Sequence, residues 1–129
     1  MDYSKAKVIV VDDNKLYLHL VKTILKKRLD IDVVTVFNPK EMFAHLEKHH
    51  IDLIILDMEM PVMDGLSALK LLRSKEKTKD IHVIPCTAIQ KTELIVQLIK
   101  LGIDDFIIKS NDNNVIVEKV QKSLDKILI

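Results

Sequence analysis

The segment that most constrains the fold of this chain runs from Ile51 to Gly65 and reads IDLIILDMEMPVMDG. Its short apolar run, Leu53 to Leu56, is bounded on both sides and predicts a buried strand. The run ends on Asp57, after which a proline and a glycine turn the chain through a loop. An acidic residue at the carboxyl end of a core strand faces the crevice in which open α/β sheets bind their ligands.

Other apolar runs resemble this one, and residues with helical spacing fill the intervals between them. We predict strands over Lys7–Val11, Asp32–Phe37, Leu53–Leu56, His82–Thr87 and Phe106–Ile108. We predict helices around Leu16–Leu25, from Asn38 until His49 and His50, after Gly65, over Leu94–Leu101 and over Val115–Leu128. This alternation is typical of an α/β fold, with a five-stranded parallel sheet and five helices covering both faces. Because the chain has no repeat or linker, residues 1–129 are expected to form a single domain.

Local signals sharpen these predictions. The apolar face of the first helix is expected to consist of Leu16, Tyr17, Leu20, Val21, Ile24 and Leu25. Asn38, Pro39 and Glu41 are the residue types that favour the cap, the first and the third positions of a helix. Pro85 lies inside the fourth strand, where it removes one ladder hydrogen bond, so we expect a bulge or distortion just before Thr87.

Composition narrows the classes of function. The formal net charge is +1, so no overall field attracts nucleic acid or an anionic membrane. No apolar run approaches the 18 or so residues that a transmembrane helix needs. The single cysteine, Cys86, suits a reducing compartment, and the N-terminus lacks the apolar core of a secretory signal. We therefore expect a cytoplasmic location.

Polar residues stand at the carboxyl ends of four predicted strands: Asp12 and Asp13, Asp57, Thr87, and Lys109. In a parallel sheet these ends lie along one edge, so the side chains are expected to converge. Adjacent carboxylates repel one another unless a cation neutralises them, and Mg²⁺ is the hard cation that carboxylate oxygens suit. Lys109 and Thr87 would donate to an anion at the same place, and an aspartate nucleophile can form an acyl phosphate. The pattern predicts magnesium-dependent phosphoryl transfer onto Asp57.

The segments VVDDN, LDMEMPVMDG, CTA and GIDDFIIKS resemble the receiver domain of two-component response regulators, and the resemblance covers nearly the whole chain. It implies the flavodoxin-like topology with strand order 2-1-3-4-5, of which the chemotaxis regulator of this family is itself a standard example. It further implies that the chain is a regulatory phosphoacceptor and not an enzyme acting on other substrates.

The resemblance also assigns roles to individual residues. The groups that carry the transfer fall on Asp57, Thr87 and Lys109. The magnesium ligands fall on Asp13, Asp57 and the backbone carbonyl of Glu59, with Asp12 acting mainly through water. The phosphate-binding groups fall on Thr87, Lys109 and the backbone of Met58 and Ala88. The switch residues fall on Thr87 and Phe106, and the positions that tune phosphate lifetime fall on Glu59 and Ile89.

The implied function is a signalling switch that takes a phosphoryl group from a histidine kinase or a phosphotransfer protein. Phosphorylation would draw Thr87 inward and bury Phe106, changing the surface of the fourth helix, fifth strand and fifth helix. That surface would contact a downstream protein or a second copy of the chain, with no direct role for nucleic acid. The apolar residues of 94–101 cover roughly 220° of a helical wheel, whereas a core-facing stripe needs about 100°. We therefore expect an exposed apolar strip there.

Three alternatives remain open. A receiver fold acting without phosphorylation is suggested by Pro85 and by Ser110, which stands where the family usually has proline. Because a cis peptide before serine is costly, we expect either a trans bond with a reshaped loop or a strained cis bond held by the site, and the position of the Lys109 ammonium depends on which of them forms. An aspartate-nucleophile phosphatase is disfavoured because Glu59 replaces its second aspartate and the chain lacks room for a cap domain. A flavodoxin-like electron carrier is disfavoured because Asp12 and Asp13 would repel a flavin phosphate.

Overall fold

The computed structural model describes residues 2–109 and 112–128, in which strands and helices alternate strictly. The strands are β1 (Val8–Val11), β2 (Val33–Val36), β3 (Leu53–Asp57), β4 (His82–Thr87) and β5 (Ile107–Ile108). The helices are α1 (Lys15–Leu29), α2 (Pro39–Lys48), α3 (Gly65–Ser74), α4 (Thr92–Lys100) and α5 (Asn113–Ile127). Each predicted element is present, and most of their bounds differ from the prediction by a few residues.

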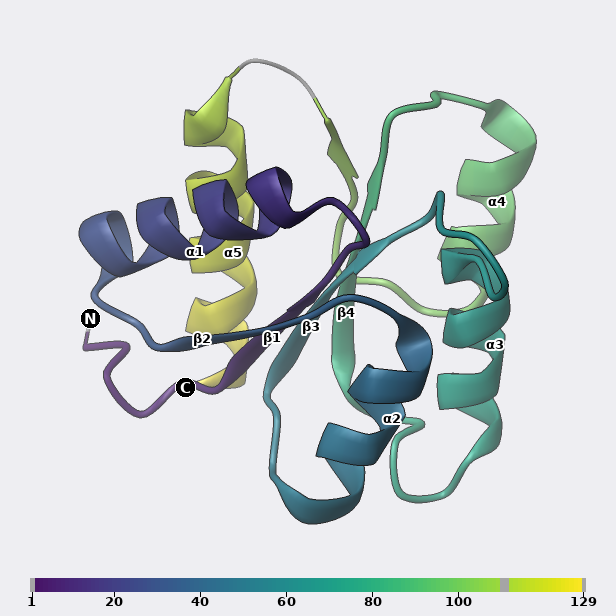
Figure 1. Cartoon of the computed structure of the whole chain (residues 1–129), viewed down its shortest axis with the longest axis horizontal. Helices are drawn as coiled ribbons and strands as arrows, with labels where there is room; N and C mark the ends of the chain where they lie inside the picture. Colours follow the sequence, from purple (N-terminus) through teal and green to yellow (C-terminus); the bar gives the residue numbers. More distant parts are fainter. Residues whose placement is uncertain (1, 110–111, 129) are drawn as a thin grey trace.

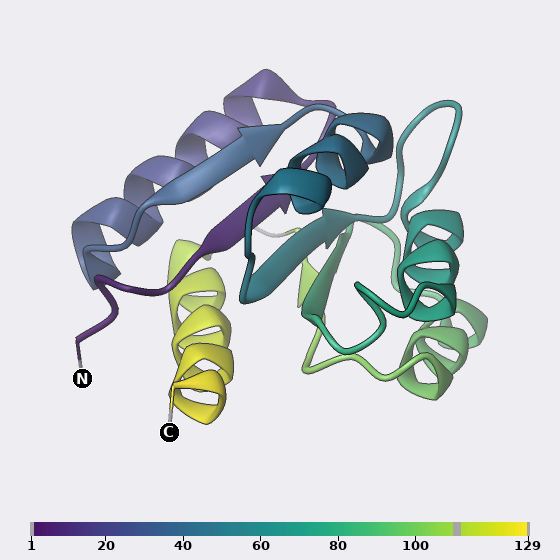
Figure 2. The same ribbon diagram turned by 90° about the horizontal axis from the view of Figure 1, so that it is seen from below.

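The strands form one parallel sheet in the order β2-β1-β3-β4-β5, as the resemblance implies. Helices α1 and α5 cover one face, and α2, α3 and α4 cover the other (Figures 1 and 2). Alternate residues of a strand serve opposite faces, so Val8 and Val10 pack on the side of α1 and α5 while Ile9 and Val11 pack beneath α2 to α4. This double coverage explains why the strands are continuously apolar instead of alternating.

The predicted apolar face of α1 is partly wrong. Its buried residues are Leu18, Val21 and Leu25, whereas Leu16 is 83% exposed and Leu20 is 40% exposed. A helix turns only one stripe toward the core, and the stripe through Leu18 is the one that joins the core between the sheet and α5, with α1 packed against β1, β2 and α5. Leu16 and Leu20 lie on the opposite side of the helix and face solvent.

The start of α2 is as predicted. The side chain of Asn38 accepts a hydrogen bond from the N–H of Glu41 at 2.8 Å, and Pro39 occupies the first turn. The Glu41 carboxylate in turn accepts from the N–H of Phe37 at 2.7 Å. These reciprocal bonds satisfy two donors that the helix itself leaves unpaired.

The distortion expected at Pro85 is wrong. Strands β3 and β4 pair residue for residue through Pro85, which lies opposite Leu56. The carbonyls of Val83 and Thr87, on either side of Pro85, both accept hydrogen bonds from the segment 104–109. Because backbone groups alternate in direction along a strand, the ring nitrogen of Pro85 also faces β5. The ladder there is only two residues long and begins after Pro85, so the missing donor interrupts nothing.

No helix in the described part of the chain combines the length and apolar character that crossing a bilayer requires.

Candidate functional site

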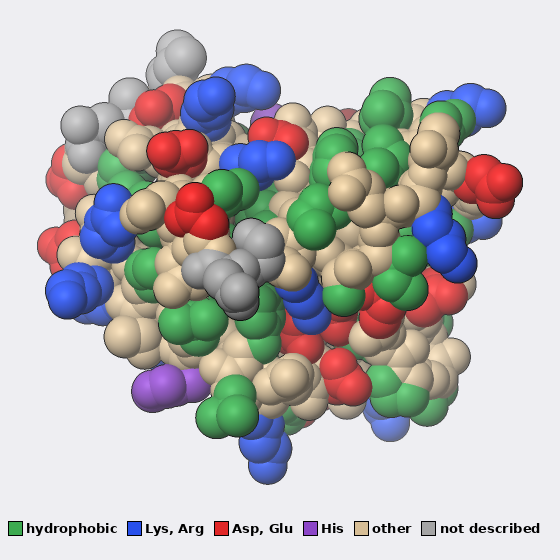
Figure 3. Space-filling model, turned by 90° about the horizontal axis from the view of Figure 1, so that it is seen from above, with side chains coloured by type: hydrophobic (Ala, Val, Ile, Leu, Met, Phe, Trp, Pro, Cys, Tyr) green, Lys and Arg blue, Asp and Glu red, His purple; other side chains and the backbone are tan. Residues whose placement is uncertain are grey.

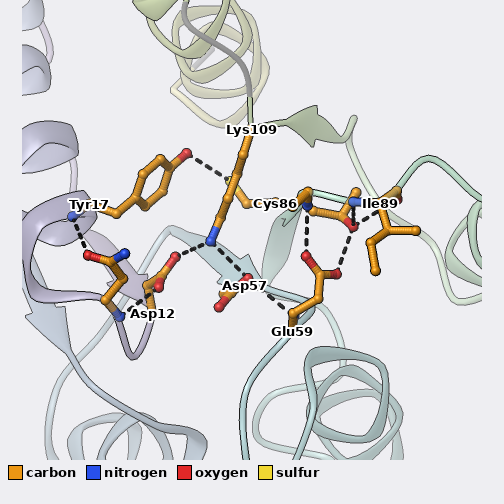
Figure 4. Close-up of polar contacts among 10 residues, drawn as sticks. Asp12, Tyr17, Asp57, Glu59, Cys86, Ile89 and Lys109 are labelled. Atoms are coloured by element: carbon orange, nitrogen blue, oxygen red, sulfur yellow. Dashed lines mark hydrogen bonds and ion pairs between the residues drawn. The ribbon is translucent and has the colours of Figure 1, made fainter.

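The polar residues that follow the strands converge at one edge of the sheet, as the parallel topology predicts (Figure 4). One carboxylate oxygen from each of Asp12, Asp13 and Asp57 lies within 4.8 Å of the others. The side chains of Asp12 and Asp57 are buried, whereas Asp13 is exposed. From the side on which the chain leaves β5, Figure 3 shows acidic side chains gathered around a basic one in the middle of the face.

Lys109 is the internal counter-ion of this cluster. Its Nζ lies 2.7 Å from Oδ2 of Asp12 and 3.0 Å from Oδ1 of Asp57. The ammonium also sits 4.5 Å from the centre of the Tyr17 ring, whose face favours a cation. Burial lowers the pKa of Lys109, but the hydrogen bonds and charges of both carboxylates outweigh burial, so the pKa is raised. Lys109 therefore stays charged.

Asp57 holds its negative charge poorly despite Lys109. Burial raises the pKa of Asp57 to about 6, with the charge of Asp12 adding to the effect and Lys109 opposing it. One ammonium thus does not fully offset two buried carboxylates. A divalent cation would complete the neutralisation, and a donor set of carboxylate oxygens fits a hard metal ion.

Backbone N–H groups fix the orientation of the two buried carboxylates. Asp12 Oδ1 accepts from the N–H of Asn14 at 2.9 Å, and Asp57 Oδ1 accepts from the N–H of Glu59 at 3.2 Å. Each donor lies two residues after the aspartate it bonds, where the turning chain directs its N–H back at the side chain. The acidic side chains are therefore held in place before any ligand arrives.

Three of the four predicted phosphate-binding groups are already bonded to other groups of the protein. Thr87 is fully buried at the end of β4, and its hydroxyl and the N–H of Ala88 both bond to the carboxylate of Glu59. The N–H of Met58 donates to the carbonyl of Cys86 at 2.8 Å, within the pairing of β3 and β4. Of the four predicted phosphate-binding groups, only the Lys109 ammonium bonds to the Asp57 carboxylate.

The remaining predicted residues lie at the margin of the site. Ile89 is 43% exposed, and its backbone N–H donates a hydrogen bond to the Thr87 hydroxyl at 3.0 Å. Phe106 is half-buried, with the ammonium of Lys119 at 5.1 Å from its ring centre. Ser110, on which the expected loop rearrangement depended, lies outside the described residues.

Two participants escaped the sequence analysis. Tyr17 was assigned only to a helix face, yet its ring lies against Lys109 and its hydroxyl is 3.8 Å from the Cys86 sulfur. The carboxylate of Glu59 was considered only as a tuning group, yet it bonds two groups of the β4 end. The signal that could have found both residues is their distance from the acidic residues in the sequence. Tyr17 follows Asp13 by about one helical turn, and Glu59 follows Asp57 by two residues.

Comparison with known proteins gives a consistent result. The family model described as "Response regulator receiver domain" matches residues 8–121. The chain is 33% identical over 115 residues to the CAI-1 autoinducer sensor kinase/phosphatase CqsS of Vibrio cholerae, covering 88% of this chain but only 17% of that protein. It is 29% identical over 119 residues to the chemotaxis protein CheY of Bacillus subtilis, covering 92% of this chain and 98% of that protein.

A solved structure, the receiver domain of Francisella response regulator 1452, superposes with a TM-score of 0.84 at 30% sequence identity. The match covers 95% of this chain and 98% of that one. The chain is thus similar to a small segment of one sensor kinase and to the whole length of one chemotaxis protein.

Proposed function

Since this chain belongs to the family of response regulator receiver domains, we propose that it is a phosphorylation-dependent signalling switch whose phosphoacceptor is Asp57. The observation that carries the proposal is the position of Asp57, which is buried at the end of β3, bonded to Lys109 and adjacent to Asp12 and Asp13. A receiver of a two-component system implies a histidine kinase as partner. Residues 1–129 would act as one receiver domain.

In the proposed reaction an oxygen of Asp57 attacks the phosphorus of a phosphohistidine on a histidine kinase or phosphotransfer protein. The new P–O bond forms as the P–N bond breaks, and the imidazole leaves with the electron pair and takes up a proton. The product is an acyl phosphate on Asp57. Lys109, 3.0 Å from Asp57, would offset the negative charge on the transferred group. Thr87 and the N–H of Ala88 would receive the phosphoryl oxygens, and the N–H of Met58 would join them on leaving the carbonyl of Cys86.

The acidic cluster fits Mg²⁺, because its donors are hard carboxylate oxygens within 4.8 Å of one another. We propose that Asp13, Asp57 and the backbone carbonyl of Glu59 hold the ion, with Asp12 acting through water. Bound there, the ion would supply positive charge to the phosphoryl oxygens.

The acceptor assignment is tested by intact-mass measurement after incubation with acetyl phosphate and Mg²⁺. We expect the wild type to gain one phosphoryl group and Asp57→Asn to gain none. Asp80→Asn is a matched control, because it changes the same chemical group at an exposed position after α3. An unmodified wild type, or equal labelling of Asp57→Asn, would contradict the proposal and favour a receiver fold that works without phosphorylation.

We further propose that α4, β5 and α5 form the output surface, bound by a downstream protein or a second copy. Of the apolar residues in α4 only Leu98 is fully buried, while Val96 is 44% and Ile99 is 62% exposed. This exposure agrees with the strip expected from the helical wheel. Val96 and Ile99 are one helical turn apart, and exposed apolar side chains that adjoin in this way are typical of an interaction surface.

We expect an Ile99→Lys variant to lose phosphorylation-dependent association, because a charge placed in an apolar interface must be desolvated. Light scattering and crosslinking of the phosphorylated protein, alone and with partner proteins, provide the measurement. Leu16→Lys is the control, since Leu16 is also apolar and is 83% exposed but lies on α1. A phosphorylated protein that stays monomeric and binds nothing would refute this output surface.

A further inference from the structure

The carboxylate of Glu59 bridges the ends of two strands. Its Oε2 accepts from the Thr87 hydroxyl at 2.7 Å, and its Oε1 accepts from the N–H of Ala88 at 2.7 Å. Figure 4 shows the Glu59 side chain extending from beside Asp57 toward the start of the loop that follows β4. Both bonds have the short lengths of hydrogen bonds to a charged acceptor.

The two donors that hold Glu59 are donors that the proposed function reserves for a phosphoryl group. A carboxylate presents two anionic oxygens from one carbon, as a phosphoryl group presents them from one phosphorus, so one fork of donors suits both. The fork cannot serve both anions together, because Ala88 has one N–H and the Thr87 hydroxyl has one hydrogen. That hydrogen is already shared between Glu59 and the Ile89 carbonyl, 2.9 Å away.

The position of Glu59 makes this competition unavoidable. Its own N–H donates to Asp57 Oδ1, so its backbone is tied to the phosphoacceptor. The side chain is only partly buried, so it can rotate outward to solvent when another anion takes its place. Until it rotates, its charge repels a phosphoryl group arriving on Asp57.

We infer that Glu59 is a built-in competitor that occupies the Thr87 and Ala88 donors in the resting protein and must be displaced when a phosphoryl group binds. This inference rests on the proposed function, because it assigns the resting occupant of the same site. It makes Glu59 a determinant of how tightly the site holds a phosphoryl group. It also means that Thr87 is bonded to an anion before phosphorylation, so the later step exchanges one anion for another.

The test is binding of beryllofluoride, a phosphoryl analogue, in the presence of Mg²⁺. Calorimetric titration would compare the wild type with Glu59→Gln, Glu59→Ala and the control Glu93→Gln. Glu93→Gln removes the same charge from the nearby first turn of α4, away from the Thr87 and Ala88 donors. We expect both Glu59 variants to bind about tenfold more tightly, the factor that one charge-assisted hydrogen bond contributes. Glu93→Gln should bind as the wild type does.

A second readout needs no phosphoryl analogue. In the resting protein, hydrogen exchange of the Ala88 amide should accelerate in Glu59→Ala and stay unchanged in Glu93→Gln, because only the first variant removes its acceptor. Exchange that is equally fast in all proteins would show that the Glu59 contact does not persist, which overturns the inference.

The outcomes separate this inference from the proposed function. Equal or weaker analogue binding by the Glu59 variants, with binding by the wild type, overturns the competitor role and leaves phosphorylation at Asp57 standing. If none of the proteins binds the analogue, the proposed function fails, and the competitor role fails with it.

Discussion

A Gly65→Ala variant is expected to lose about 3 kcal/mol or more of unfolding free energy, because the added methyl group has no space. A Cβ at residue 65 would lie 2.2 Å from the carbonyl oxygen of Asp57 and 2.6 Å from the Cα of Met58. Asp57 ends β3 and Met58 follows it directly, so relief requires moving the end of the strand that carries Asp57. The N–H of Gly65 also donates to the Met58 carbonyl at 3.1 Å, a bond that such a shift would strain.

Chemical denaturation measures this loss, and Gly102→Ala provides the control. A Cβ at Gly102 would meet nothing within 4 Å, but its φ of +77° carries the usual cost of a side chain in the left-handed region, about 1 kcal/mol. We expect the loss at Gly65 to exceed that at Gly102 and to be accompanied by weaker labelling of Asp57. Similar losses at the two glycines would show that the crowding at Gly65 is relieved at little cost.

Neutralising Asp57 is expected to stabilise the metal-free protein at neutral pH by roughly 2–3 kcal/mol. Burial raises the pKa of Asp57 to about 6 in the folded protein, against the ordinary value of 3.8. Between these values the folded state binds more protons than the unfolded state, so wild-type stability from this group falls as pH rises. Asp57→Asn carries no such charge, so its advantage should be absent below about pH 4 and complete above about pH 6.

The measurement is the free energy of unfolding of both proteins from pH 4 to pH 7 in the presence of a chelator. Asp80→Asn should show no comparable gain, since Asp80 is an exposed acidic residue outside the cluster. Added Mg²⁺ should narrow the gap, because an ion that binds the folded wild type stabilises it. An Asp57→Asn protein that is less stable than the wild type at pH 7 would disprove the unfavourable burial of this charge.

The sequence was sufficient to predict the fold and the meeting of Asp12, Asp57 and Lys109, because parallel strands bring their carboxyl ends to one edge whatever their separation in the chain. The strand order itself came from family resemblance. Two local predictions failed for a common reason. The buried face of α1 depends on how the helix is rotated against the sheet. Whether β4 accommodates Pro85 without distortion depends on which neighbouring strand its ring nitrogen faces. The spacing of apolar residues in the sequence limits these orientations but does not determine them.

The role of the Glu59 carboxylate was beyond the reach of sequence reasoning for a different reason. Its partner Thr87 is 28 positions away, and the contact depends on the rotamer of a long flexible side chain. The family resemblance identified Glu59 as a tuning position but gave no sign that its carboxylate bonds to Thr87 in the resting protein. By contrast, the undistorted register at Pro85 removes one of the two grounds for a receiver that works without phosphorylation, and the other, Ser110, lies outside the described residues.

The bond between Lys109 and Asp12 joins residues that are 97 positions apart in the chain. During synthesis, a ribosome that has completed β3 has already made Asp57, but the lysine that compensates its charge does not yet exist. Contacts of such long sequence separation form late in folding, when most of the chain is available. The counter-ion of the buried carboxylates is therefore in place only after β5 has been made and has joined the sheet, so we expect the acidic cluster to be uncompensated in any partly folded form that lacks β5.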